Sequence, residues 1–349
     1  MANNFAVGPR LPRDCTFTSG DWHILSRYWH PVAFSREVGE APLAVRLLDE
    51  DLVVYRTSSE IVVAKDICLH RGAKLSLGRL DGDDLVCGYH GWRYASGGQC
   101  VRIPSQPERI RISKNARLFT FAAAERYGLV WVRLAPDAGE PDLPEWPEAE
   151  DPAYRVVPLP PLDWSTSSAR EVDNFTDVSH FSFVHAASFG NGIDPEVPEV
   201  KVDRTATGIR YDFSYVAYNT DTSPVSGAAS VTRYTTTEIT LPFSVRLKQH
   251  LPERGDAYYA VFNTSSPVSA RKSRTFVLSC RNYNLDVPDD EIREWECKVM
   301  AEDQRIVESQ RPEELPLNLH EELHVRADRV ATAYRHALTD LGLGSELTA

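Results

Sequence analysis

The sequence predicts the α+β fold class, with an all-β N-terminal domain and a second domain in which helices accompany an antiparallel sheet. The first part of the chain consists of short apolar runs separated by Gly and Asp turn signals, whereas helical patterns begin only after a proline-rich stretch. A chain of 349 residues is also long for one hydrophobic core. Strands framed by helices in the second part are typical of α+β domains.

Residues 28–135 are expected to form the all-β domain, after an N-terminal segment at 1–27. LAVRLLDEDLVVY (43–55) places an acidic turn between two apolar halves, which is the pattern of a hairpin. AERYGLVWVRL (124–134) is a further strand region, rich in aromatic and β-branched residues.

Residues 136–163 are expected to be a linker or a wrapping segment, because eight prolines there exclude a regular helix. The second domain then occupies 164–349. Its expected elements are a helix at 167–185, strands between 199 and 282, and closing helices at 288–311 and 322–341.

Composition and charge exclude some classes of binding partner. The net charge is −12, so the surface would repel nucleic acid and anionic membranes. No apolar run approaches the ~20 residues of a membrane span, and the N-terminus does not read as a secretory signal. We therefore expect a cytoplasmic protein with no membrane or nucleic-acid partner, whose six scattered cysteines are thiols or metal ligands rather than disulfides.

Four potential metal ligands lie in two short boxes of the all-β domain. Cys68 and His70 form a C-x-H box, and Cys87 and His90 form a C-x-x-H box. Two thiolates and two imidazoles can close a zinc site, which would make the protein a zinc-stabilised binding module without catalytic activity. Zinc motifs usually pair Cys with Cys and His with His, however. One Cys and one His from each box suit a [2Fe–2S] cluster in which the cysteines bind one iron and the histidines the other.

The two boxes, CLHRGAKLSLG and CGYHGWRY, resemble the cluster-binding motifs of the Rieske non-haem iron oxygenases. Leu69 replaces the proline often found in the first box, at a position that does not bind metal. The resemblance covers essentially the whole chain and implies a Rieske [2Fe–2S] domain at 28–135 and a catalytic domain at 164–349. The catalytic domain is expected to be helix-grip-like, with helices holding a mononuclear iron beside an antiparallel sheet.

A second constellation lies in NFTDVSHFSFVH (174–185). His180 and His185 would stand ~140° apart on an ideal helix, so both can bind one metal only if the helix ends or distorts between them. Two histidines and a carboxylate form the facial triad of non-haem Fe(II) oxygenases. By resemblance to the family, the carboxylate is that of Asp303. Its neighbour Glu302 is the rival, which is expected to point ~100° away on the helix.

Asp177 lies three residues before His180, and we expect the two to share a helix face. The resemblance assigns Asp177 to electron transfer, as a bridge between the cluster ligand His90 of one subunit and the iron ligand of the next. That role implies a head-to-tail homotrimer. Asn174 is assigned a supporting role beside the iron.

The implied function is that of a terminal oxygenase subunit in the monooxygenase and demethylase branch. The tail of the chain is similar to that of saxitoxin-pathway hydroxylases, with caffeine N-demethylases and dicamba O-demethylase as more distant relatives. The expected reaction is O2- and NAD(P)H-dependent hydroxylation, or oxidative N- or O-demethylation, of a small aromatic, heterocyclic or terpenoid-like substrate. A separate flavin and iron–sulfur reductase would supply electrons, because the chain has no GxGxxG nucleotide motif. Arene cis-dihydroxylation by the same iron is the alternative.

The substrate pocket is expected between the strands at 210–282 and the loop at 189–199. Candidate lining residues are Phe189, Tyr218, Phe262 and Asn282. Each can equally be an ordinary core or sheet residue, so the sequence does not identify the substrate.

Overall fold

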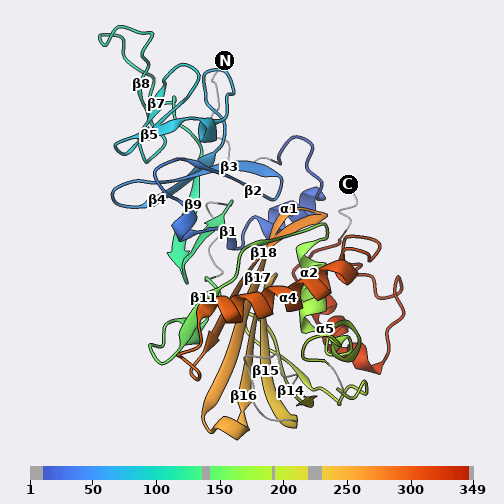
Figure 1. Ribbon diagram of the computed structural model, residues 1–349. Coiled ribbons are helices and arrows are strands. Elements are labelled where there is room, and N and C mark those ends of the chain that lie inside the picture. Colours follow the sequence, from blue (N-terminus) through green and yellow to red (C-terminus); the bar gives the residue numbers. More distant parts are fainter. Residues whose placement is uncertain (1–10, 136–141, 191–192, 219–229, 346–349) are drawn as a thin grey trace. The chain divides into compact units, whose positions relative to one another are not determined.

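The structure is a computed structural model that describes residues 11–135, 142–190, 193–218 and 230–345 (Figure 1). The chain divides into two compact units, Met1–Asp142 and Leu143–Ala349. Each unit has its own sheets and its own core. Within the described ranges, no helix combines the length and the apolarity that crossing a membrane requires.

The first unit is built on antiparallel strands. Its elements are α1 (Ser19–Leu25), β1 (His30–Phe34), η1 (Ser35–Glu37), β2 (Leu43–Leu47), β3 (Glu50–Arg56), β4 (Ile61–Lys65), η2 (Leu75–Leu77), β5 (Arg79–Asp81), β6 (Asp84–Val86), β7 (Arg93–Tyr94), β8 (Cys100–Arg102), β9 (Thr120–Arg126) and β10 (Leu129–Arg133). A six-stranded sheet has the order β1-β10-β9-β4-β3-β2, and a four-stranded sheet has the order β5-β6-β7-β8.

One hydrophobic core joins the two sheets of this unit. Val53 of β3 and Leu85 of β6 are fully buried and share this core with Cys68 and Cys87, the cysteines of the two metal-binding boxes. Cys68 lies in the loop after β4, and Cys87 lies in the loop after β6. Each loop is therefore anchored in the core by its own cysteine.

The second unit contains an eight-stranded antiparallel sheet and several helices. Its elements are η3 (Pro147–Ala149), β11 (Arg155–Pro158), β12 (Leu162–Trp164), α2 (Ser168–Thr176), α3 (Phe181–Val184), β13 (Val202–Arg204), β14 (Gly208–Tyr218), β15 (Ser230–Thr240), β16 (Ser244–Leu251), η4 (Pro252–Arg254), β17 (Ala257–Ser269), β18 (Lys272–Arg281), α4 (Asp289–Val307), η5 (Arg326–Asp328) and α5 (Arg329–Asp340). The strand order is β11-β18-β17-β16-β15-β14-β13, and β12 also pairs with β18.

Side-chain alternation along β17 shows which face of this sheet the helices cover. Tyr259 and Val261 belong to one buried cluster with Met300 of α4, and Asn263 donates a hydrogen bond to Glu171 of α2. Successive side chains of a strand point to opposite faces, so these odd-numbered residues mark the covered face. Figure 1 shows α2 and α4 lying across it.

The helix expected at 167–185 is broken. The α2 helix ends at Thr176, and α3 is a single turn between His180 and His185. Asp177 has extended backbone (φ −76°, ψ 137°), and its carboxylate accepts backbone N–H groups two and three residues ahead. Such local bonds compete with helix continuation, which explains a break that the residue pattern alone does not place.

The proline-rich stretch also differs from a simple linker, because its part beyond Leu143 is built into the second unit. Trp146 is fully buried, and Glu148 is 3% exposed and ion-paired with Arg246. The β11 and β12 strands pair with β18 at the edge of the sheet. Proline excludes a regular α-helix there but is tolerated in an edge strand.

Candidate metal centres

The two boxes of the first unit fold into the same turn. In each, the cysteine N–H donates to the carbonyl five residues ahead (Cys68 to Ala73 at 2.8 Å, Cys87 to Trp92 at 2.9 Å), and the cysteine carbonyl accepts from a glycine four residues ahead at 3.0 Å. Those glycines, Gly72 and Gly91, have φ of +71° and +69°. Only glycine adopts this backbone readily, so the repeated turn requires glycine in both boxes.

The four predicted cluster ligands lie together at these turns. The rings of His70 and His90 are 4.5 Å apart between centroids. The two thiols, each 2% exposed, are close enough that Cys87 raises the pKa of Cys68, an effect smaller than that of burial, which also raises it. A buried thiol with a raised pKa stays protonated unless a metal takes the place of its proton.

The His70 ring is held by Trp92, which stacks on it at 4.8 Å with an interplanar angle of 7°. Nδ1 of His70 is buried and has no hydrogen-bond partner in the described part of the chain. A buried nitrogen without a partner is costly, and a metal ligated through Nδ1 removes that cost. The residues of the two boxes therefore fit a [2Fe–2S] cluster.

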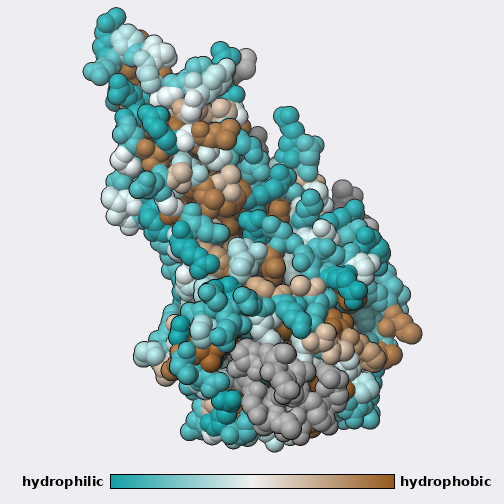
Figure 2. Space-filling model, in the orientation of Figure 1, coloured by the Kyte–Doolittle hydropathy of each residue, from teal (hydrophilic) through white to brown (hydrophobic). Residues whose placement is uncertain are grey.

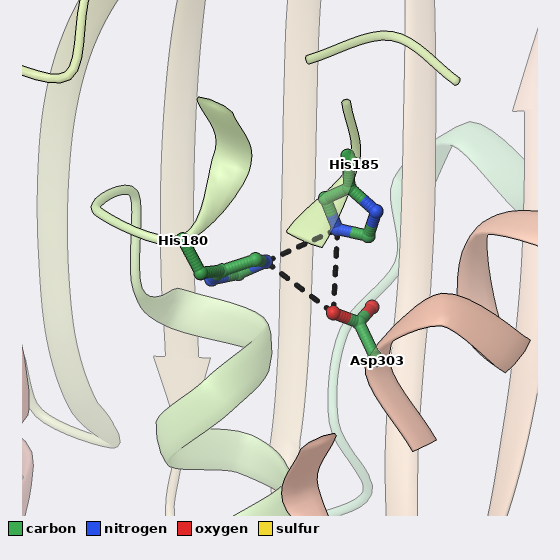
Figure 3. Close-up of side chains that lie close together, drawn as sticks. All are labelled: His180, His185 and Asp303. Carbon is green, nitrogen blue, oxygen red and sulfur yellow. Dashed lines mark hydrogen bonds and ion pairs between the residues drawn. The ribbon is translucent and has the colours of Figure 1, made fainter. Parts of the chain in front are cut away.

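The second unit brings together three predicted iron ligands from two distant segments (Figure 3). Nε2 of His180 and Nε2 of His185 are 3.1 Å apart, and Oδ1 of Asp303 lies 3.4 Å from the first and 3.3 Å from the second. The donor atoms of the three residues all lie within 4.8 Å of one another, a spacing that a single metal ion can bridge. Two imidazoles and one carboxylate are the ligand set of the non-haem iron triad.

His180 is oriented by Asp177. Oδ2 of Asp177 lies 3.2 Å from Nδ1 of His180 and also accepts the His180 backbone N–H, while Oδ1 accepts the N–H of Ser179 at 2.9 Å. The predicted contact between the two side chains is present, but a turn makes it rather than a shared helix face. With Nδ1 bonded to a carboxylate, Nε2 is left to face the other two ligands.

His185 is oriented by Glu302, a contact that the sequence analysis did not predict. The Oε2 atom of Glu302 lies 2.9 Å from Nδ1 of His185 and accepts the Ser188 hydroxyl at 2.7 Å. The ~100° step between adjacent helix positions still gives them different roles, because Asp303 faces Nε2 while Glu302 reaches around to Nδ1 of the same ring. These two carboxylates raise the pKa of His185 against the opposing effect of burial.

Three aromatic side chains, Phe181, Phe189 and Tyr215, lie beside the two histidines and are called the aromatic wall below. Phe189 stacks on His185 at 4.6 Å with an interplanar angle of 30°, and Phe181 contacts Phe189 at 5.1 Å and Tyr215 of β14 at 5.6 Å between ring centroids. Of the four predicted pocket residues, the structure therefore brings Phe189 next to a predicted metal ligand. The residue pattern did not reveal Phe181 and Tyr215.

The other predicted pocket residues have different settings. Phe262 is buried on the opposite face of β17 from Asn263, stacked on Trp146 at 5.4 Å. Asn282 bonds the backbone of Tyr258 and Asp256 at the start of β17. The side chain of Tyr218 lies outside the described residues. For Asn174, the structure shows a backbone bond from the N–H of Asp177 to its carbonyl.

A buried acid lies behind the triad. Glu171 of α2 is 2% exposed and accepts the Asn263 amide at 3.0 Å. Burial raises the pKa of Glu171 to about 8, and the charge of Asp303 adds to the increase. Burial thus favours the neutral form of this carboxyl, which adds no further negative charge behind the predicted metal ligands.

The family is shown by two matches that together cover most of the chain. The Rieske [2Fe-2S] domain family matches residues 28–122, and the vanillate O-demethylase oxygenase C-terminal domain family matches residues 164–343. The chain belongs to the Rieske non-haem iron oxygenases, as a terminal oxygenase subunit. Its cofactors are a Rieske [2Fe–2S] cluster and a mononuclear iron, as the sequence predicts.

The relatives that the chain resembles include demethylases. The chain is 34% identical to methylxanthine N1-demethylase NdmA of Pseudomonas putida, over 91% of this chain and 89% of the relative. It is 32% identical to methylxanthine N3-demethylase NdmB of the same organism, over 93% and 92%. The solved structure of Pseudomonas putida CBB5 NdmA with caffeine matches with a TM-score of 0.80 at 32% identity and covers 91% of both chains.

These comparisons confirm the predicted α+β fold class and the predicted enzyme class, an oxidoreductase that incorporates oxygen from O2. Proteins of this family act on small molecules and receive electrons from reductases. The family assignment thereby excludes the alternative of a zinc-stabilised binding module without catalytic activity.

Proposed function

We propose that this oxygenase removes N-methyl groups from flat heteroaromatic compounds of the methylxanthine kind. The observation that carries the proposal is the aromatic wall on the metal ligands, where Phe189 stacks on His185 and Phe181 adjoins Tyr215. A wall of π-rings favours a flat π-system as substrate. The methylxanthine N-demethylases among the relatives support the same substrate class.

Each residue has a separate task in this proposal. His180, His185 and Asp303 would hold Fe(II), which supplies the O2 chemistry at the positions that three protein ligands leave free. Asp177 and Glu302 hold the two imidazoles with Nε2 toward the metal. The aromatic wall holds the substrate with its methyl group toward the triad and excludes water.

The proposed reaction balances with two electrons and two protons. One atom of O2 enters a C–H bond of the N-methyl group, and the other leaves as water. The resulting N–CH2OH group breaks its C–N bond, which releases formaldehyde and the N–H product. Electrons come from NAD(P)H through a separate reductase.

We further propose that the chain works as a head-to-tail homotrimer, in which Asp177 bonds His90 of the partner subunit. Support comes from exposure: the Asp177 side chain is 33% exposed although it bonds His180, and His90 is exposed in its own unit. A cytoplasmic location suits the reduced thiolates that Cys68 and Cys87 must supply.

The test is turnover with caffeine and theobromine, with NADPH and a ferredoxin–reductase pair as electron source. We expect formaldehyde and the demethylated xanthine in equal amounts. Reaction under ¹⁸O2 separates the alternative, because a demethylated xanthine retains no label whereas a cis-diol retains two atoms. If neither methylxanthine is consumed while an O-methyl arene such as dicamba releases formaldehyde, N-demethylation is the wrong assignment and the O-demethylase relatives are the better guide.

A further inference from the structure

A basic segment stands out in this acidic protein. The basic loop, residues 102–117 (RIPSQPERIRISKNAR), leads from the end of β8 toward β9 and has Glu108 as its one acidic residue. Its net charge is +4, whereas that of the whole chain is −12. The cations are Arg102, Arg109, Arg111, Lys114 and Arg117.

All five of these side chains are exposed, and none forms an ion pair within the described residues. Three other arginines of the same unit differ in this respect. Arg46, Arg56 and Arg93 each pair with a carboxylate of their own unit. The loop therefore keeps its positive charge available to an outside partner.

The loop begins against the second cluster-binding turn. A Cβ placed on Gly91, the residue after His90, would lie only 3.2 Å from Cγ of Pro104. Ile103 is buried in the same hydrophobic core as Cys68 and Cys87. A protein bound to this loop would thus sit beside the predicted cluster.

The loop is held in place at its base. The Gln99 side-chain amide donates to the carbonyls of Ser113 and Ala116, at 3.3 and 3.0 Å, and the Cys100 N–H donates to Ala116 at 2.7 Å. The loop lines an open hollow of about 460 Å³. Val101 and Ile110 line this hollow and are 47% and 48% exposed.

Figure 1 shows the loop as the projection beyond β8, and Figure 2 shows a largely hydrophilic surface there, with a few apolar atoms. Exposed apolar side chains within a charged rim are the usual composition of a transient protein interface. The positive charge of the basic loop favours an acidic partner, because long-range attraction between opposite charges increases the rate at which the two proteins meet.

We propose that the basic loop is the docking surface for the electron donor, an acidic ferredoxin-type [2Fe–2S] protein or domain. The inference rests on the role of the chain as a terminal oxygenase and adds the surface at which electrons enter it. In each encounter the reduced donor cluster loses one electron and the Rieske cluster gains it, with no bond made or broken. A second copy of this chain is the rival occupant, since the remainder of the chain is acidic.

The test measures reduction of the Rieske cluster without substrate. Stopped-flow absorbance follows the oxidised holoenzyme mixed with a reduced plant-type [2Fe–2S] ferredoxin, an acidic protein, at several salt concentrations. The variant is Arg109→Glu/Arg111→Glu. The matched control is Arg27→Glu/Arg36→Glu, which makes the same charge change at exposed arginines near α1 and η1 that have no ion pairs in the described part of the chain.

We expect the loop variant to lower the second-order rate constant about tenfold or more at low salt, and the difference to vanish near 0.5 M NaCl. The control should stay within about twofold of wild type, and excess dithionite should reduce the cluster of all three proteins to the same extent. Three results would contradict the proposal. They are equal rate constants of cluster reduction for the two variants, a wild-type rate constant that does not fall with salt, and no reduction of the cluster by this ferredoxin. Loss of the native oligomer in the loop variant alone, by light scattering, would assign the loop to a second copy instead. Because no substrate is present, failure here is distinct from failure of N-demethylation.

Discussion

The two predicted metal centres are assembled from the chain in opposite ways. All four predicted ligands of the cluster lie within residues 68–90, on two copies of one turn. The iron triad needs a helix break at Asp177 and a carboxylate from α4, at residue 303. The first centre is therefore specified locally, whereas the second exists only when α2, α3 and α4 are packed together. Changes in the second unit should leave the cluster untouched, and the predictions below test that separation.

The largest effect is expected for Asp303→Ala. Removing the carboxylate that faces both Nε2 atoms should abolish binding of the mononuclear iron and reduce turnover by about a thousandfold or more. Metal analysis should show loss of the mononuclear iron, with an unchanged cluster absorbance. Glu294→Ala, at an exposed position of the same helix, is the control. Loss of the cluster in Asp303→Ala would show that the two metal centres are not independent of each other.

Asp177→Asn should keep both metals yet lower turnover about a hundredfold, because it removes the charge of the proposed bridge. Iron content and cluster reduction by dithionite check that neither centre is lost. Asp194→Asn, at an exposed loop position, is the matched control. Near-normal coupled turnover in Asp177→Asn would refute the bridging role.

Glu302→Gln should weaken iron binding by roughly 10- to 100-fold, since partners of the ligand histidines contribute to metal affinity on that scale. Titration of iron into the metal-depleted second centre measures the change. Glu294→Gln should have no effect. An unchanged affinity would mean that the contact between Glu302 and His185 does not support the metal site.

The smallest and most specific effect concerns pH. Burial raises the pKa of Glu296 on α4 to about 8, from 4.5, and Tyr259 donates a hydrogen bond to this carboxyl. Between these values the folded chain keeps a proton that the unfolded chain has lost, so stability falls as pH rises, by about 1.4 kcal/mol per pH unit from this group.

Glu296→Gln should remove that slope. The urea midpoint of the second unit should rise relative to wild type at pH 8 and match it near pH 4.5, with no change in the cluster absorbance. Glu294→Gln again serves as the control. A variant that is no more stable than wild type at pH 8 would show that Glu296 is ionised in the folded protein.

The difference between the two centres also explains what the sequence could reveal. The cluster boxes and the α+β fold class follow from spacing and periodicity, which are local properties. The partner of His185 is not local, because helix geometry gives the angle between Glu302 and Asp303 but not the position of the ring between them. The face of the sheet on which the Phe262 side chain lies depends on strand register, because a shift of one residue moves every side chain of the strand to the opposite face. The ligand roles of the named residues remain predictions that the variants above test.

One consequence of α3 bears on the redesign of this enzyme. Phe181, part of the aromatic wall, lies within the single turn that separates His180 from His185. A substitution there would alter the proposed substrate wall and, at the same time, the backbone that spaces the two predicted iron ligands. Libraries for new substrates should therefore vary Tyr215 on the sheet before Phe181, because a strand position can change selectivity without loss of metal occupancy.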